Sequence, residues 1–284
     1  MTENPNPLNK YFRQASIYVK LPSGTDYPLD VVTPSKTGEI GIMPMTAKDE
    51  IRFKTPDALM NGQGVVDVIE SCVPDIKDAW QIKSYDLDTI LVAIRIATYG
   101  ETMEINFNVP GANENVSHTV NLPAILDELR ASKVDSEIVL KDGLKINVRP
   151  LTYKDMTSTS LQTFQQQKMY SAIQDSNLSD EEKAKRFNDA FKKLTDLNSS
   201  ILLKNIQMVT MPDNTEITDA THIKEFIENA NATLVKEIED ELTKLRGQGA
   251  VKPLKMKATE EQIKKGAPVT YEVPVTFDTS NFFG

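Results

Sequence analysis

Few residues of this chain are of the types that catalyse reactions or bind metals, and those few are scattered. Among 284 residues there is one cysteine, Cys72, and there are two histidines, His118 and His222. Neither histidine has a second ligand at the spacing of a zinc site, and three soft ligands are too few for an ordinary structural zinc. Cys72 lies beside an apolar residue, which favours a buried, inert thiol over a nucleophile. The sequence therefore predicts no bound metal and no other cofactor.

Two further patterns resemble parts of enzyme sites without completing them. Gly62-Gln-Gly64 begins like a dinucleotide-binding loop, but the third glycine is missing and a predicted helix precedes it. We interpret this pattern as a turn that breaks a helix. The second pattern is a group of four carboxylates on the polar side of a predicted helix, with Lys236 and Lys244 on either side: Glu237, Glu239, Asp240 and Glu241. Such a group indicates a solvated helix face. The sequence thus predicts no catalytic residues, and we expect a protein that is not an enzyme.

Charge and hydropathy exclude further classes of protein. The formal net charge is -9, from 32 Lys+Arg against 41 Asp+Glu, which argues against a generally basic nucleic-acid binder. The most apolar run, at residues 89–94, is interrupted by Arg95 and is too short to span a bilayer. We therefore expect no nucleic-acid partner and no membrane segment.

The predicted helices and strands indicate two parts of the chain, with a boundary at residue 150. We predict that residues 1–150 form a mixed part with short helices and β-hairpins. Alternating apolar residues around turn sequences predict hairpins near residues 103–120 and 137–148. A further hairpin is expected between residues 30–33 and 39–42, which flank a Pro- and Gly-containing turn.

The clearest helix of the first half is predicted at residues 86–99. Its apolar residues, including Ile94, recur at helical spacing. Gly100 follows at the position where a glycine commonly ends a helix. We therefore expect Ile94 to lie in the core.

The second half, residues 151–284, is predicted to be a mainly helical module with an extended C-terminal tail. Residues 153–211 are expected to be nearly all helical. Residues 218–245 show one apolar side and are expected to form a single long amphipathic helix. The predicted fold class is therefore α+β.

Two surfaces are candidates for binding a partner. A glutamine patch on the helix after residue 152 includes Gln165 and Gln166, although an ordinary exposed helix face would look the same. The C-terminus gathers Phe277, Phe282 and Phe283 within its last eight residues, whereas most termini are polar. Three exposed rings would form an adhesive patch, so this segment docks either on its own domain or on a partner.

Several blocks of the sequence resemble the baseplate hub assembly family of contractile-tailed phages of the T-even type. The most specific are Thr-Pro-Asp-Ala-Leu-Met-Asn-Gly at residues 55–62 and Ser-Asn-Phe-Phe at residues 280–283. The other blocks occur in order along nearly the whole chain, at residues 6–14, 43–50, 69–74, 91–100 and 148–153.

This resemblance implies a non-enzymatic phage tail protein that takes part in assembling the central hub of the baseplate through protein–protein contacts. Other hub or tail proteins would be its partners, and a homo-oligomer is left open. The expected location is the host cytoplasm during assembly, with the baseplate of the virion tail as a further location. Residues 148–211 also resemble, more weakly, a helical module of tail assembly chaperones. One alternative is therefore a chaperone absent from the mature virion. A hub-associated peptidoglycan hydrolase is disfavoured, because no catalytic constellation is found.

The sequence departs from the family pattern at one hairpin. Many relatives are expected to carry a Cys-x-x-Cys pair where this chain has residues 109–115, which contain no cysteine. We therefore expect no zinc knuckle here. The turn at Pro110-Gly111 and the pairing of the strands must hold the hairpin together instead.

Overall fold

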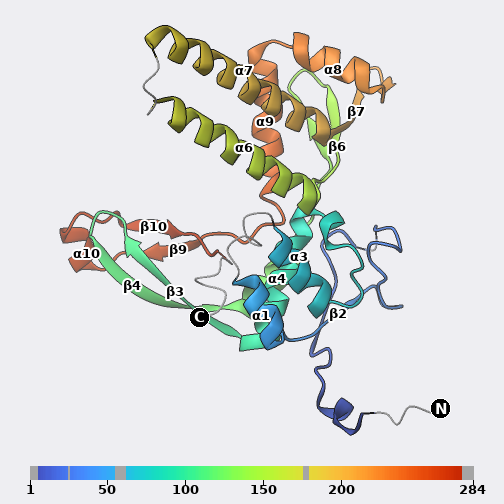
Figure 1. Cartoon of the computed structure of the whole chain (residues 1–284), viewed down its shortest axis with the longest axis vertical. Helices are drawn as coiled ribbons and strands as arrows, with labels where there is room; N and C mark the ends of the chain where they lie inside the picture. The colour runs from blue at the N-terminus through green and yellow to red at the C-terminus, as the bar shows by residue number, and fades with distance from the viewer. Residues whose placement is uncertain (1–5, 25, 55–61, 175–178, 277–284) are drawn as a thin grey trace. The chain divides into compact units, whose positions relative to one another are not determined.

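The computed structural model describes residues 6–24, 26–54, 62–174 and 179–276. Contacts between residues divide the chain into two compact units, and its fold is α+β, as predicted (Figure 1). The first unit comprises Met1–Ala79, Asp86–Ser132 and Gly249–Gly284, and the second comprises Trp80–Tyr85 and Lys133–Gln248.

These units do not follow the division at residue 150. The hairpin at residues 137–148 belongs to the second unit, because its second strand pairs with a strand formed by Ile206–Thr210. The strands after Gly249 belong to the first unit. Both assignments depend on contacts between segments far apart in the sequence.

The N-terminal part of the first unit contains a short 3-10 helix, a two-stranded sheet and two helices. These are η1 (Pro7–Tyr11), β1 (Ile17–Val19), β2 (Ile40–Ile42), α1 (Ala47–Phe53) and α3 (Gln63–Cys72). The hairpin expected between residues 30–33 and 39–42 is wrong, because β2 pairs with β1. Val32 instead forms an isolated antiparallel β-bridge with Ile76. Asp75, which precedes Ile76, accepts from the backbone N–H of Gly41 through Oδ2 at 2.9 Å.

The predicted helix of the first half is confirmed as α4 (Ser84–Tyr99). Ile90 and Ile94 are fully buried, as expected for core residues. Gly100 follows the helix with a φ of 93°, a left-handed conformation that glycine adopts without steric cost.

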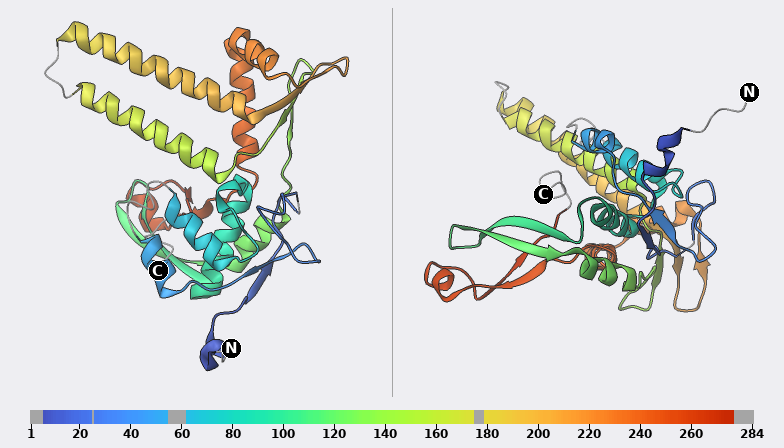
Figure 2. Two further views of the ribbon diagram at one scale, coloured as in Figure 1. Left: turned by 45° about the vertical axis from the view of Figure 1, so that its right-hand side comes forward. Right: turned by 90° about the horizontal axis from the view of Figure 1, so that it is seen from below.

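Two antiparallel ribbons complete the first unit. The predicted hairpin at residues 103–120 is confirmed as β3 (Thr102–Val109) and β4 (Glu114–Asn121), and α5 (Leu122–Ala131) follows it. The second ribbon pairs β9 (Leu254–Lys257) with β10 (Thr270–Val273), and α10 (Glu260–Lys264) connects them. Figure 2 shows the ribbons side by side, and their ring contact joins Phe107 to Tyr271 with centroids 6.1 Å apart.

The second unit is built on a four-stranded antiparallel sheet of order β5-β6-β7-β8. The predicted hairpin at residues 137–148 is confirmed as β5 (Glu137–Val139) and β6 (Lys145–Val148). The expectation of helix up to residue 211 is wrong at its end, where residues 206–210 form β7. Pairing with β6 accounts for this strand, and β8 (Glu216–Ile217) lies at its other edge.

Four helices accompany this sheet: α6 (Tyr153–Gln174), α7 (Asp180–Asn205), α8 (Ala220–Asn229) and α9 (Ala232–Arg246). The single helix expected over residues 218–245 is wrong. The chain leaves helical geometry at Ala230, and the Asn231 side chain accepts from the Leu234 N–H to begin a new helix. The predicted apolar side still forms the core of the unit, through residues such as Ile223, Ile227, Ile238 and Leu242. No helix in the described ranges combines the length and apolarity needed to cross a membrane.

Candidate functional site

The histidines and the cysteine lie on separate elements. His118 is half-buried on β4, opposite Ile105, and His222 is exposed in the first turn of α8. Cys72 is fully buried at the end of α3. Within the described ranges, no three His, Cys, Asp or Glu side chains come together in a way that could hold a metal ion.

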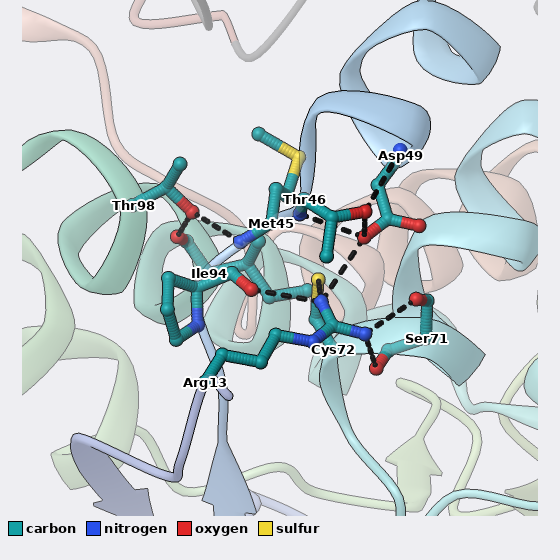
Figure 3. Close-up of polar contacts among 9 residues, drawn as sticks. Arg13, Met45, Thr46, Asp49, Ser71, Cys72, Ile94 and Thr98 are labelled. Atoms are coloured by element: carbon teal, nitrogen blue, oxygen red, sulfur yellow. Dashed lines mark hydrogen bonds and ion pairs between the residues drawn. The ribbon is translucent and has the colours of Figure 1, made fainter. Parts of the chain in front are cut away.

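Cys72 lies beside the guanidinium of Arg13, whose Nη1 is 3.7 Å from Sγ (Figure 3). Burial raises the pKa of this thiol to about 12, in spite of the nearby positive charge. A thiol with this pKa carries almost no thiolate at neutral pH, which excludes an activated nucleophile.

The hydrogen bonds of Arg13 give it a structural role. Its Nη1 donates to Pro44 O at 2.8 Å and to Asp49 Oδ2 at 3.0 Å. Its Nη2 donates to both the carbonyl oxygen and the hydroxyl of Ser71, each at 2.8 Å. One side chain thus joins the N-terminal segment to α1 and α3.

Asp49 is held from a second side. It accepts from the Thr46 N–H at 2.8 Å and from the Thr46 hydroxyl at 2.7 Å, and the two residues form the capping box of α1. Beside it, the Thr98 hydroxyl of α4 accepts from the Met45 N–H at 3.0 Å. The hydrogen bonds of this cluster thus position elements of the fold.

The glycine pattern and the carboxylates also have structural roles. Gly62 precedes α3 with a φ of 79°, as expected for a turn that begins a helix. Glu237 Oε1 accepts from the Lys141 N–H at 3.1 Å, and Glu241 pairs with Lys244 at 2.5 Å. Glu239 and Asp240 line a groove of about 1230 Å³ beside α7, α8 and α9. The lining of this groove alternates acids with the lysines 204, 224 and 236, so no set of acids converges there.

The glutamine patch lies on α6, which runs beside α7 (Figures 1 and 2). Gln165 is exposed and Gln166 is half-buried. The half-buried stripe of α6 is polar, with Thr159, Thr163 and Gln166 at helical spacing. Within that stripe, the Gln166 Oε1 atom is buried without a hydrogen-bond partner. The side of α6 that an amphipathic helix would normally make apolar is therefore polar.

The apolar side chains of α6 lie on its exposed face instead. Leu161 and Phe164 are 36% and 41% exposed, and they share a face with Gln165 and Lys168 because these positions are three, four and seven residues apart. The Lys168 ammonium lies 4.7 Å from the centroid of the Phe164 ring. We call these four residues the α6 outer face. Its neighbours from residue 156 to 167 carry no charge, which fits contact with another protein.

The two ribbons of the first unit meet at their tips. A Cβ atom placed on Gly111, whose φ is 78°, would lie 2.3 Å from the carbonyl oxygen of Gly266. Glu114 accepts from Gln262 Nε2 at 3.3 Å and pairs with Lys265 at 3.1 Å. These contacts, together with the predicted turn and strand pairing, hold the hairpin that carries no cysteine pair.

The second predicted partner-binding group, Phe277, Phe282 and Phe283, lies outside the described residues.

Comparison with known sequences decides the family. The sequence model described as T4 bacteriophage base plate protein matches residues 24–265, which is most of the chain. The chain belongs to the T4 bacteriophage base plate protein family. No curated protein and no solved structure matches it.

Membership of the base plate family gives the α6 outer face and the joined ribbons a context. The α6 outer face, β3, β4, β9 and α10 lie inside the matched residues 24–265, whereas η1, Gly266, β10 and the three terminal phenylalanines lie outside them. A base plate is an assembly of proteins, so contact surfaces are the functional sites to expect. The sequence missed the outward position of Leu161 and Phe164, although their three-residue spacing on a charge-free stretch was visible.

Proposed function

We propose that this member of the base plate family is a non-enzymatic protein that takes part in assembling the central hub. The family match over residues 24–265 is the observation that carries the proposal. The buried thiol of Cys72 and the separated histidines are consistent with a role without catalysis. Assembly takes place in the host cytoplasm, and the partners are other hub or tail proteins.

The α6 outer face supports action through protein contacts. Leu161 and Phe164 are exposed, and burying them against a partner would remove apolar surface from water. Gln165 can donate and accept hydrogen bonds at the edge of such a contact. The occupant that fits is an apolar helix or strand face of another hub or tail protein.

The deciding experiment removes the gene for this chain from a phage that carries it and examines the tails. Accumulation of incomplete hubs supports the proposal, whereas normal tails contradict it.

Mass spectrometry of purified virions then separates two roles: a hub component stays in the particle, and an assembly chaperone does not. Clearing of a peptidoglycan gel by the purified protein would instead indicate a hydrolase.

The contact surface is tested by Leu161→Ser with Phe164→Ser in the full chain. Both side chains are already exposed, so the melting temperature should stay within about 2 °C of the unsubstituted protein. Incorporation into tails should fall at least tenfold. Ser160→Ala with Gln167→Ala on the same helix is the matched control and should assemble normally. Normal incorporation of the serine variant would exclude this face, and dimer formation in sedimentation that the serine pair abolishes would identify a second copy as the occupant.

The terminal rings are tested in the same way. Phe282→Ala with Phe283→Ala should abolish tail assembly with little change in melting temperature if the rings bind a partner. A strongly lowered melting temperature would mean that they dock on their own domain.

A further inference from the structure

Arg95 is a buried cation without a polar partner. It lies on α4 and is 4% exposed. Its Nε and Nη1 atoms are both buried and make no hydrogen bond. Within the described part of the chain, no ion pair involves its guanidinium. A buried N–H donor loses its hydrogen bonds to water, and without an acceptor in the protein this loss destabilises the fold.

The guanidinium lies against an aromatic ring. Its central carbon lies 4.6 Å from the centroid of Tyr99, one helical turn further along α4. This cation–π contact stabilises the charge from one face but satisfies none of the N–H donors, which point outward in the guanidinium plane. Burial accordingly lowers the pKa of Arg95, and the nearby Tyr99 only partly opposes this effect.

The acidic side chain that contacts Tyr99 is already engaged. Glu50 of α1 accepts from the Tyr99 hydroxyl and pairs with Lys54 Nζ at 2.7 Å. The same unit shows how an arginine is normally satisfied, since Arg13 donates to oxygen atoms of Pro44, Asp49 and Ser71. Among the described residues, Arg95 Nε and Nη1 therefore lack the oxygen acceptors that both terminal nitrogens of Arg13 have.

We propose that Arg95 is a binding site for a carboxylate side chain of another base plate protein. A carboxylate accepts from the N–H donors of a guanidinium, and the contact with the Tyr99 ring uses none of these donors, so both contacts fit at once. The cation selects an acidic partner, because only a negative charge offsets its desolvation. Tyr99 is 38% exposed, so the site is near the surface and docking has to move only part of its cover. The inference rests on the proposed function, which supplies the protein partner.

The test replaces Arg95 by Met in the full chain and measures both stability and assembly. Removing an unpaired buried charge should leave the melting temperature unchanged or raise it. The same variant should enter tails at least tenfold less well, because the partner's carboxylate then has no counter-ion. Arg130→Met is the matched control in the same unit, since Arg130 is exposed and pairs with Asp127 at 3.6 Å. It should enter tails normally.

Each outcome has a separate meaning. If the unsubstituted chain enters no hub and its loss leaves tails intact, the proposed function itself fails. If that chain is required but Arg95→Met assembles normally, only this inference fails. A lowered melting temperature of Arg95→Met also overturns it, because the guanidinium is then satisfied in the free chain. Restored assembly of Arg95→Glu by an acid-to-arginine change in a hub protein would establish the pair.

Discussion

Arg13 Nη1 donates to Asp49 Oδ2 across 3.0 Å, although 36 residues separate the two in the sequence. The Asp49 side chain is 4% exposed and that of Arg13 is 23% exposed. Because Asp49 also caps α1, this ion pair links the N-terminal segment to the start of a helix. The pair therefore holds α1 to the N-terminal segment, which contacts it through side chains.

Replacing Arg13 by Met should destabilise the first unit strongly. Asp49 would remain buried without its counter-ion, at a cost of about 2–4 kcal/mol in the free energy of unfolding. The control is Arg52→Met, which removes an exposed ion pair with Asp67 at 3.7 Å and should cost less than about 1 kcal/mol. Denaturant titration measures both, and equal losses would show that the Arg13 pair is no better than a surface pair.

The same site predicts a dependence on pH. Burial alone would raise the pKa of Asp49, but hydrogen bonds from Thr46 and Ser71 and the charge of Arg13 outweigh it, so the pKa lies below its ordinary value of 3.8. Because the pKa of Asp49 is lower in the folded protein, its ionised carboxylate stabilises the fold at pH values above the ordinary pKa. This contribution is lost as the pH falls through the lowered pKa of the folded state. Asp49→Asn should therefore be less stable than the unsubstituted protein at pH 7. The difference should shrink below about pH 4, and a constant difference would contradict the assignment.

Local patterns predicted the elements that depend on local chemistry. The alternation in β3 and β4 and the helical spacing of α4 were sufficient because each signal lies within one segment. Strand β7 was missed because it is fixed by pairing with β6, far away in the sequence. The break between α8 and α9 could have been found, since Asn231 is of a residue type that commonly caps a helix.

The candidate sites likewise differ in whether a single segment of sequence reveals them. The glutamine patch was visible from composition alone, whereas the isolation of Arg95 depends on what other segments fail to place beside it. In the sequence, Arg95 only interrupts an apolar run. The approach of Gly111 to Gly266 likewise joins two ribbons, and neither glycine differs from an ordinary turn residue when seen alone.

The buried face of α4 is tested by Ile94→Asp. Ile94 is fully buried, so a carboxylate there would be desolvated without a partner and should cost several kcal/mol, on the order of the stability of a whole domain. Leu29→Asp is the control, since Leu29 is 73% exposed in the same unit. That substitution should shift the melting temperature by about 2 °C or less. If Ile94→Asp melts as the control does, α4 is not packed as described.

The contact between the ribbon tips is tested by Gly111→Ala. Gly111 has a φ of 78°, and its Cβ would meet the Gly266 carbonyl oxygen at 2.3 Å, so the backbone of one ribbon must move. Gly24→Ala is a matched control, because Gly24 has a φ of 69° but nothing within 4 Å of the added atom. Both variants carry the strain of a left-handed alanine, about 1 kcal/mol.

Only Gly111→Ala adds the collision, which should cost about 1–3 kcal/mol more. Moving the tips apart also weakens the pairing of Glu114 with Lys265, so the second ribbon should lose its support. Amide hydrogen exchange should therefore quicken in β9, α10 and β10 of Gly111→Ala and stay unchanged there in Gly24→Ala. Equal exchange in the two variants would mean that the ribbons hold together without the contact between Gly111 and Gly266. Strand pairing alone would then support the β3–β4 hairpin, which has no cysteines.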